Sequence, residues 1–325
     1  MKKINQNLSL GLLLSASMSV VAAEAPKLSF AATEVSPGIY MLSGVGGFTG
    51  GNIGLSIGED GVVMIDDSMP PMLDIMNTAI KSVTDKPVDF LINTHVHGDH
   101  TGNNASMGQA GTRIVAHENL RKHMLDKGIQ GKEGMVPAPK AALPVITFSH
   151  AMSFHLNGED AELIHLANAH TDGDAVIHFK KANVIHTGDT LFNGMFPFID
   201  LDSGGSVDGY ISAQQSILAM ANDETKIIAG HGPLASKKDL QASIDMLLDV
   251  KNIIGQLVKA GKSEEEVVKL NPLAKYHDRW NWVFITTERM TRQIYKGLAN
   301  QNKQAGHHES HHESHHKKSD AAHSH

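Results

Sequence analysis

The chain has 325 residues, of which 41% are hydrophobic and only 5% aromatic, and it contains no cysteine. Its length and apolar content allow one large folded domain whose core is mainly aliphatic. The lack of cysteine excludes disulfides, thiolate metal ligands and cysteine nucleophiles. A formal net charge of −7 without basic blocks argues against nucleic acid as a partner.

The first 23 residues have the features of a secretory signal peptide. Lys2 and Lys3 give a positive start, residues 8–20 form a short apolar stretch, and small residues end at Ala23. A membrane-spanning helix needs roughly 20 apolar residues, and this stretch is shorter and interrupted by serines. We therefore expect cleavage after Ala23, export to the periplasm or the medium, and no membrane attachment of the mature chain.

Short apolar runs, helical periodicity and glycine-rich turns alternate in the first half of the folded region. The expected strands are residues 35–42, 51–57, 61–65, 88–93 and 113–116, and the expected helices are residues 70–83 and 118–126. A loop rich in glycine, lysine and proline is expected at residues 127–143.

A second series of strands and helices follows. The expected strands are residues 153–156, 161–167, 175–179, 183–186 and 225–229, and the expected helices are residues 208–221, 236–261, a short one after 263, and 287–298. Ser236 with Asp239, and Ser263 with Glu266, have the spacing of helix-capping pairs. Strand runs mixed with helices at both ends predict two sheets covered by outer helices.

Residues 301–325 form a tail of low complexity that we expect to be disordered. It holds eight of the 21 histidines, in pairs that repeat every four residues, and such a tract can bind zinc, copper or nickel. An engineered tag is one interpretation, but the interleaved Glu-Ser pairs favour a native tail. We interpret it as scavenging metal ions for the site described next.

The motif HVHGDH follows directly on a buried apolar strand and indicates metal chemistry. Three imidazoles and a carboxylate within six residues are suitable ligands for divalent transition metals. His95 and His97 flank a single residue, so strand alternation directs both to one side. Asp99 and His100 lie beyond the bend at Gly98 and can reach a second position.

Three later segments place a ligand-type residue beside a glycine at the end of an expected strand. They are AHTDGD with His170, HTGD with Asp189, and GHG with His231. Glycine allows close approach of the backbone. Each residue alone would more often be an ordinary loop residue, but together with HVHGDH, and in this order, they predict a shared metal site.

The order HxHxDH, His, Asp and Gly-His-Gly resembles the metallo-β-lactamase superfamily over about residues 35–298. The resemblance implies an α+β fold, a four-layer αββα sandwich, as a single domain over residues 24–300. It implies a first metal ion held by His95, His97 and His170, a second held by Asp99, His100 and His231, and Asp189 as the bridge between them. An aspartate bridge is similar to glyoxalase II and lactonase relatives, whereas class B1 lactamases have cysteine there.

The resemblance further implies a di-metal hydrolase with two Zn²⁺ ions, or alternatively iron or manganese, as cofactors. A hydroxide that bridges the metals would cleave a lactone, thioester or β-lactam bond of a small-molecule substrate, with Asp99 as the catalytic residue that orients it. Metal binding would weaken at low pH, because the histidine ligands must be neutral. The lack of lysine or arginine between Asp189 and Lys226 argues against β-lactams as the natural substrate.

Three phenylalanines are candidate substrate contacts. Phe48 lies in a glycine-rich loop, residues 44–51, which is either a mobile flap or a simple flexible turn. Phe192 and Phe196 belong to an apolar run that forms either a wall of the cleft or ordinary packing. The segment DRWNW before the last helix has the same two interpretations. Asp66 is either an acid that orients a ligand histidine or a helix N-cap.

Two other functions are open alternatives. A periplasmic metal-binding or buffering protein would explain the tail, but it would not need Asp99 and Asp189 in the family's order. An iron-dependent oxidoreductase on the same fold is the second, because aspartate-bridged sites also take iron. Its diiron electron-transfer relatives have glutamate where His97 stands, which argues against it.

Overall fold

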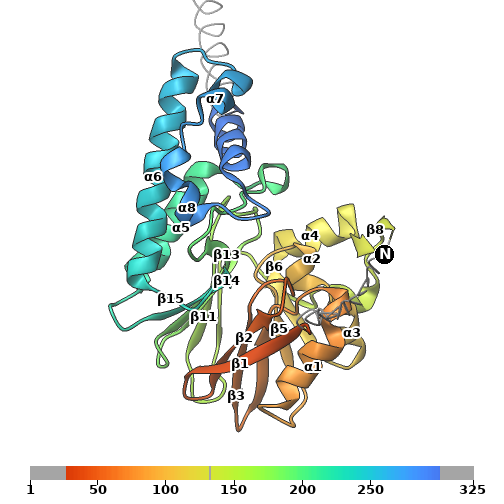
Figure 1. The fold of residues 1–325 in the computed structure, drawn as a ribbon. Coiled ribbons are helices and arrows are strands. Elements are labelled where there is room, and N and C mark those ends of the chain that lie inside the picture. The colour runs from red at the N-terminus through yellow and green to blue at the C-terminus, as the bar shows by residue number, and fades with distance from the viewer. Residues whose placement is uncertain (1–26, 132, 301–325) are drawn as a thin grey trace, which may run out of the picture.

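The structure, a computed structural model, describes residues 27–131 and 133–300. The expected signal peptide and the histidine-rich tail lie outside the described residues. A seven-stranded and a six-stranded sheet form the centre, and a separate two-stranded hairpin lies at the edge (Figure 1). No helix in this described part of the chain is both long and apolar enough to cross a bilayer.

The first sheet has the strand order β1-β2-β3-β4-β5-β6-β9. Its strands are β1 (Ser29–Ser36), β2 (Ile39–Val45), β3 (Ile53–Gly58), β4 (Gly61–Ile65), β5 (Phe90–Ile92), β6 (Arg113–His117) and β9 (Ile146–Phe148). The strands from β1 to β4 pair antiparallel, whereas β4, β5, β6 and β9 run parallel. The motif HVHGDH therefore begins just past the carboxyl end of β5, a central parallel strand.

The second sheet has the order β10-β11-β12-β13-β14-β15. Its strands are β10 (Ala151–Phe154), β11 (Ala161–His165), β12 (Ala175–Phe179), β13 (Val184–Phe192), β14 (Lys226–His231) and β15 (Ala235–Ser236). Only β13 and β14 pair in parallel, and their register shifts on both sides of Gly188. This irregular stretch of β13 contains Asp189.

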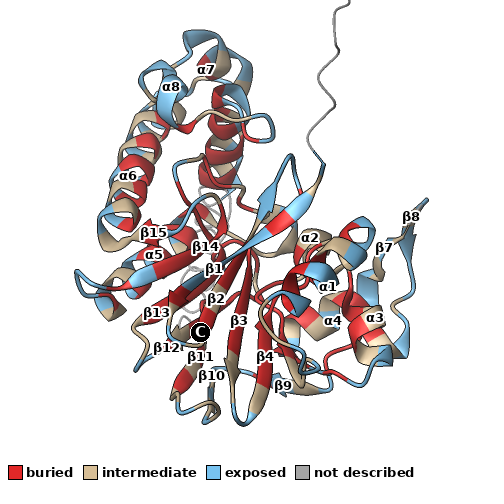
Figure 2. Cartoon of the chain, turned by 60° about the horizontal axis from the view of Figure 1, so that its bottom comes forward, coloured by how far each residue is buried: buried red, intermediate tan, exposed pale blue. Residues whose placement is uncertain are grey.

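The two sheets pack face to face through a shared apolar core. Ile65 and Ile92 of the first sheet and Ile177 and Ile228 of the second belong to one cluster of buried side chains. Figure 2 shows these strands as the most continuously buried part of the molecule. Removing such side chains from water is the main favourable term in folding, about 25 cal/mol per Å² of apolar surface.

Helices cover the outer face of each sheet (Figure 1). The helices on the side of the first sheet are α1 (Leu73–Lys81), α2 (Gly98–Thr101), α3 (Asn104–Gln109) and α4 (Glu118–Lys127). Those on the side of the second are α5 (Val207–Met220) and α6 (Lys237–Lys259). Met76 of α1 packs on Leu55 and Leu91, and Ile244 of α6 shares a buried cluster with Ile185. The expected αββα sandwich is confirmed.

The C-terminal helices extend beyond the sheets. They are α7 (Glu264–Leu270), α8 (His277–Trp280) and a helix over residues 287–300, and they share a second large core with α5 and α6. Both expected capping boxes are present, at Ser236 with Asp239 and at Ser263 with Glu266. Four 3-10 turns complete the helical segments: η1 (Pro70–Met72), η2 (Lys140–Ala142), η3 (Leu201–Ser203) and η4 (Ala274–Tyr276).

Two expected elements were wrong in detail. Residues 35–42 form no single strand, because the chain turns at Gly38, with φ +74°, between β1 and β2. Strand β1 is mostly exposed and so lacks the apolar alternation by which a half-buried strand is recognised. The expected loop at residues 127–143 contains the hairpin of β7 (Ile129–Gly131) and β8 (Gly134–Val136).

Candidate metal centre

The structure brings together all seven residues that the sequence analysis singled out as metal ligands. They form two clusters, His95, His97, His170 and Asp189 in the first, and Asp99, His100 and His231 in the second. Within each cluster the candidate ligand atoms lie within 4.8 Å of one another. Each cluster combines residues that follow β5 of the first sheet with residues of the second sheet.

Asp189 lies between the two clusters, and each of its carboxylate oxygens faces one of them. Its Oδ2 is 3.6 Å from Nε2 of His95 and 3.5 Å from Nε2 of His170. Its Oδ1 is 3.1 Å from Nε2 of His100 and 3.4 Å from Nε2 of His231. This is the placement that a carboxylate shared by two cations requires.

Hydrogen bonds on the far side of the rings orient the histidines of the first cluster. Nε2–H of His97 donates to Asp200 Oδ2 at 2.9 Å, and Nδ1–H of His170 donates to the Phe198 carbonyl at 2.8 Å. A neutral imidazole that donates from one nitrogen has a lone pair on the other. Nδ1 of His97 and Nε2 of His170 are 2.9 Å apart and are the atoms left for a metal.

Asp66 orients the second cluster. Its fully buried carboxylate accepts hydrogen bonds from the backbone and hydroxyl of Thr94 and, at 2.7 Å, from Nδ1–H of His100. Nε2 of His100 therefore faces the centre and is the atom that can bind a metal once it has lost its proton. The alternative that Asp66 caps a helix is wrong, because Met69 occupies the N-cap of the next helical turn. Asp66 has φ +60°, an uncommon conformation for a residue other than glycine.

Two buried polar atoms at the centre have no hydrogen-bond partner among the described residues, Nε2 of His95 and Oδ1 of Asp189. An unsatisfied buried polar atom costs about 1–3 kcal/mol, so such atoms usually have a partner of another kind. Imidazole nitrogens and carboxylate oxygens, without thiolates, are a suitable donor set for zinc, iron or manganese. The residues present therefore fit two divalent cations.

The two clusters differ in the charge of their histidines. Burial lowers the pKa of His170 to about 4 and that of His95 well below its usual range. In the second cluster burial acts in the same direction, but the carboxylates of Asp189 and Asp99, joined by Asp66 at His100, together outweigh burial. They raise the pKa of His231 to about 9 and the pKa of His100 well above its usual range. At neutral pH the first cluster is ready to bind a metal, whereas the second must first lose protons.

We therefore expect zinc binding to release protons mainly from the second cluster. Its affinity should rise as the pH increases toward the pKa of about 9 of His231, whereas His170 of the first cluster, with a pKa of about 4, is already neutral well below pH 7. Calorimetric titrations in buffers of different ionisation enthalpy measure the protons released. Equal proton release by the two binding events would contradict the assignment.

Two glycines let the backbone pass close to metal-ligand side chains. A Cβ atom at Gly51 would lie 2.1 Å from Cε1 of His100, and one at Gly230 would lie 2.1 Å from Oδ1 of Asp189. Both contacts are far below van der Waals distance. The backbones of the residue 44–51 loop and of β14 can therefore approach the ligands this closely only without a side chain.

Replacing Gly51 with alanine should displace the ring of His100 and weaken the second metal by about 10- to 100-fold. The metal content after dialysis against a weak chelator measures this loss. Gly255→Ala is the matched control, because its Cβ would make only an ordinary contact of 3.7 Å with Leu298. Retention of the second metal in Gly51→Ala would show that the ring can move without consequence.

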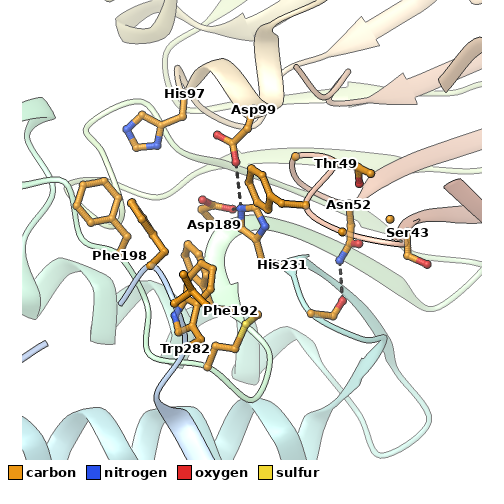
Figure 3. Close-up of a pocket in the computed structure, with 18 of the residues that line it drawn as sticks. Ser43, Thr49, Asn52, His97, Asp99, Asp189, Phe192, Phe198, His231 and Trp282 are labelled. Carbon is orange, nitrogen blue, oxygen red and sulfur yellow. Dashed lines mark hydrogen bonds and ion pairs between the residues drawn. The ribbon is translucent and has the colours of Figure 1, made fainter. Parts of the chain in front are cut away.

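A cavity of about 1070 Å³ opens beside the centre and is lined by His97, Asp99, Asp189 and His231 (Figure 3). Two of the three predicted substrate contacts line it, Phe48 and Phe192. The ring of Phe48 stacks on that of His231 with centroids 5.8 Å apart, so the glycine-rich loop is placed over the site. A second cavity, of about 900 Å³, extends along the β7–β8 hairpin and shares His97, Gly98 and Asp99 with the first.

The assignment of Phe196 to the cavity is wrong. Its side chain is fully buried and belongs to the core that α5, α6 and the C-terminal helices share. Phe198, two residues later, lines the cavity instead, together with Trp282 and Phe284. Both interpretations of the segment DRWNW apply, because Trp280 is buried in the core and Trp282 lines the cavity. No periodic pattern in the sequence distinguishes these two residues.

Comparisons with known proteins identify the family of the chain. The sequence profile described as the Metallo-beta-lactamase superfamily matches residues 46–231. The chain is 30% identical over 151 residues to hydroxyacylglutathione hydrolase GloC of Haemophilus influenzae. The matched residues cover 46% of this chain and 70% of that protein. It is 25% identical over 192 residues to the 2,4-dinitroanisole O-demethylase subunit alpha of Nocardioides sp., and spans 55% of that subunit's length.

Solved structures show the same fold at low identity. A metallo-beta-lactamase from Pontibacter korlensis superimposes with a TM-score of 0.57 at 16% identity, covering 68% of this chain and 99% of that one. The sec-alkylsulfatase Pisa1 from Pseudomonas sp. gives a TM-score of 0.63 at 16% identity, covering 82% of this chain and 50% of that one. With its sandwich, its paired histidine and aspartate clusters and the profile match over more than half of its length, the chain belongs to the metallo-β-lactamase superfamily.

Proposed function

We propose that the protein is a di-metal hydrolase, with zinc as its metal, that cleaves an acyl bond of the lactone, thioester or β-lactam type. The observation that carries this proposal is the position of Asp189, one oxygen of which faces each cluster. The likeness to a hydroxyacylglutathione hydrolase supports a thioester or ester in particular. A metal-buffering protein would need neither this shared carboxylate nor the adjoining cavity.

The chain's own residues bind and orient the reactants. Asp99 keeps its charge, because burial, which would raise its pKa, is outweighed by His100 and His231 together, and these lower the pKa of Asp99 to about 2. Its Oδ2 is 3.3 Å from Nε2 of His231 and borders the cavity, so it can accept a hydrogen bond from a water molecule and fix the orientation of that water (Figure 3). Bound divalent cations would supply Lewis acidity, which lowers the pKa of water and polarises an acyl oxygen.

Hydrolysis of a panel of S-lactoylglutathione, homoserine lactones and nitrocefin, before and after chelation, tests this function. We expect turnover of a thioester or lactone that is lost with chelator and restored by added zinc. The metal content of protein purified without added metal tests the iron alternative. A redox-active iron centre without turnover of the panel would overturn the proposal.

A second candidate reaction is the cleavage of an aryl methyl ether. The aromatic lining of the cavity and the likeness to the 2,4-dinitroanisole O-demethylase subunit favour it. Hydrolysis of 2,4-dinitroanisole would yield 2,4-dinitrophenol and methanol, and the phenolate is measured by its absorbance.

We also propose that the chain is exported and that its tail scavenges metal. The N-terminal pattern of residues 1–23 and the histidine pairs after residue 306 support these two proposals. Cell fractionation and N-terminal sequencing test the first, with Glu24 expected as the first residue of the mature chain. Deletion of residues 306–325 tests the second, and activity should fall only when metal is limiting.

A further inference from the structure

Aromatic rings form a continuous wall of the larger cavity, from one metal-ligand cluster to the other (Figure 3). Phe192 lies 5.0 Å from the ring of His231 and 6.0 Å from Trp282. The rings of Trp282 and Phe284, and those of Phe284 and Phe198, are each 5.5 Å apart. Phe198 in turn stacks on His97 at 5.8 Å. These separations are typical of interacting aromatic side chains.

This wall is apolar and offers no free polar hydrogen. Nε1–H of Trp282 donates to the Phe196 carbonyl at 2.8 Å, so the indole is held with its polar group satisfied. At the mouth of the cavity Phe48 is 56% exposed, Phe284 43% and Val283 99%. Apolar side chains grouped around a cavity mouth are typical of a binding surface rather than of an ordinary protein surface.

Apart from the metal-ligand histidines, the ionisable residues that line the cavity are acidic. They are Asp99 and Asp189, and none of the described residues that line the cavity is lysine or arginine. Arg289 lies close by, where its guanidinium stacks on Phe284 at 4.1 Å and on Phe198 at 5.6 Å and donates from Nη1 to the Phe284 carbonyl at 2.9 Å, but it is not among the lining residues. A carboxylate held against these rings, away from the metals, would lose its water, and no described lysine or arginine lines the cavity to replace that hydration.

We propose that this cavity selects an uncharged aromatic acyl group and rejects one that bears a remote carboxylate. The inference rests on the proposed acyl hydrolysis and names the class of substrate for it. Water supplies the oxygen of the new C–O bond, the bond to the leaving group breaks, and a thiol or alcohol leaves with a proton. The ring of the acyl group would lie against Phe192, Trp282 and Phe284.

Two thioesters of N-acetylcysteamine test the selection, those of 4-carbamoylphenylacetic and 4-carboxyphenylacetic acid. The two acyl groups have the same shape and differ by one charge, placed far from the thioester. For the metal-loaded full chain we expect kcat/KM to be about tenfold or more higher for the carbamoyl compound. Equal turnover, or a preference for the carboxylate, would overturn the inference.

A lysine placed at the mouth should change this preference. Val283→Lys adds a cation at a fully exposed lining position, and it should reduce or reverse the ratio of the two kcat/KM values. Val145→Lys is the matched control, because Val145 is 69% exposed and lines neither cavity. An unchanged ratio in Val283→Lys would count against the charge argument.

Binding of nitroaromatic quenchers separates the inference from the proposed reaction. Uncharged 4-nitroanisole should quench the fluorescence of Trp282 saturably, at concentrations about tenfold lower than the anion 4-nitrobenzenesulfonate, and Trp282→Phe should lose this signal.

If neither thioester is hydrolysed but this difference in binding remains, the hydrolysis proposal fails and the selectivity stands. If thioesters are hydrolysed and the anion binds equally well, the selectivity fails.

Discussion

Asp189→Asn should retain the fold but lose the ability to hold two metal ions. The substitution keeps the shape of the side chain and removes the charge that faces both clusters at 3.1–3.6 Å. Loss of groups that merely orient metal ligands costs about 10- to 100-fold in affinity or activity, so loss of a shared ligand should cost about 100-fold or more. Metal analysis should show one ion or none per chain, and kcat/KM should fall by at least this factor.

Asp202→Asn controls for the loss of one negative charge, because Asp202 is exposed and lies outside both clusters. Metal content should be measured on the full chain and on a variant that ends at residue 300, so that histidines of the tail are accounted for. Two tightly held metals in Asp189→Asn would contradict the bridging role and with it the proposed function.

Asp66→Ala should cause the largest loss of stability. The fully buried carboxylate accepts three hydrogen bonds, from two groups of Thr94 and from His100, and its removal leaves all three donors unsatisfied. Breaking a buried charged pair by deleting one partner costs about 3–5 kcal/mol. For a domain of this size the Tm should fall by roughly 6–20 °C. Thermal denaturation followed by circular dichroism measures the change.

Two further variants separate charge from volume. Asp74→Ala removes an exposed carboxylate from the first turn of α1 and should change the Tm little. Asp66→Asn keeps the volume and part of the hydrogen bonding, so it should recover some stability while the metal bound at His100 stays weak. Wild-type metal affinity in Asp66→Asn would show that the ring is held by packing alone.

The ligands could be predicted from the sequence because their chemistry is concentrated in one short motif. HVHGDH places four ligand-type side chains after a buried strand, and so many polar groups next to a core are costly unless they have a partner such as a metal ion. His170, Asp189 and His231 are isolated in sequence, and they could be assigned only by their order and neighbouring glycines. Their convergence depends on how two sheets pack, which no local pattern encodes.

The cavity walls were less predictable, because burial along an aromatic run depends on tertiary packing. Phe196 and Phe198 are separated by one residue, so strand alternation would place both on one face, yet one lies in the core and the other lines the cavity. Asp200, which holds His97, could not be found either, since an acid at the start of a 3-10 turn is ordinary in sequence. The hairpin of β7 and β8 was likewise hidden within a glycine-rich segment.

Both ligand clusters draw on both halves of the sandwich, since HVHGDH follows β5, Asp189 and His231 belong to β13 and β14 of the second sheet, and His170 lies in the loop between β11 and β12 of that sheet. Bound ions would consequently crosslink the two sheets, joining segments that no disulfide can join in a chain without cysteine. A ligand that binds only the native state adds stability of RT ln(1 + [L]/Kd), about 4 kcal/mol at a thousandfold excess over Kd. Metal supply would then govern the lifetime of the folded protein as well as its chemistry.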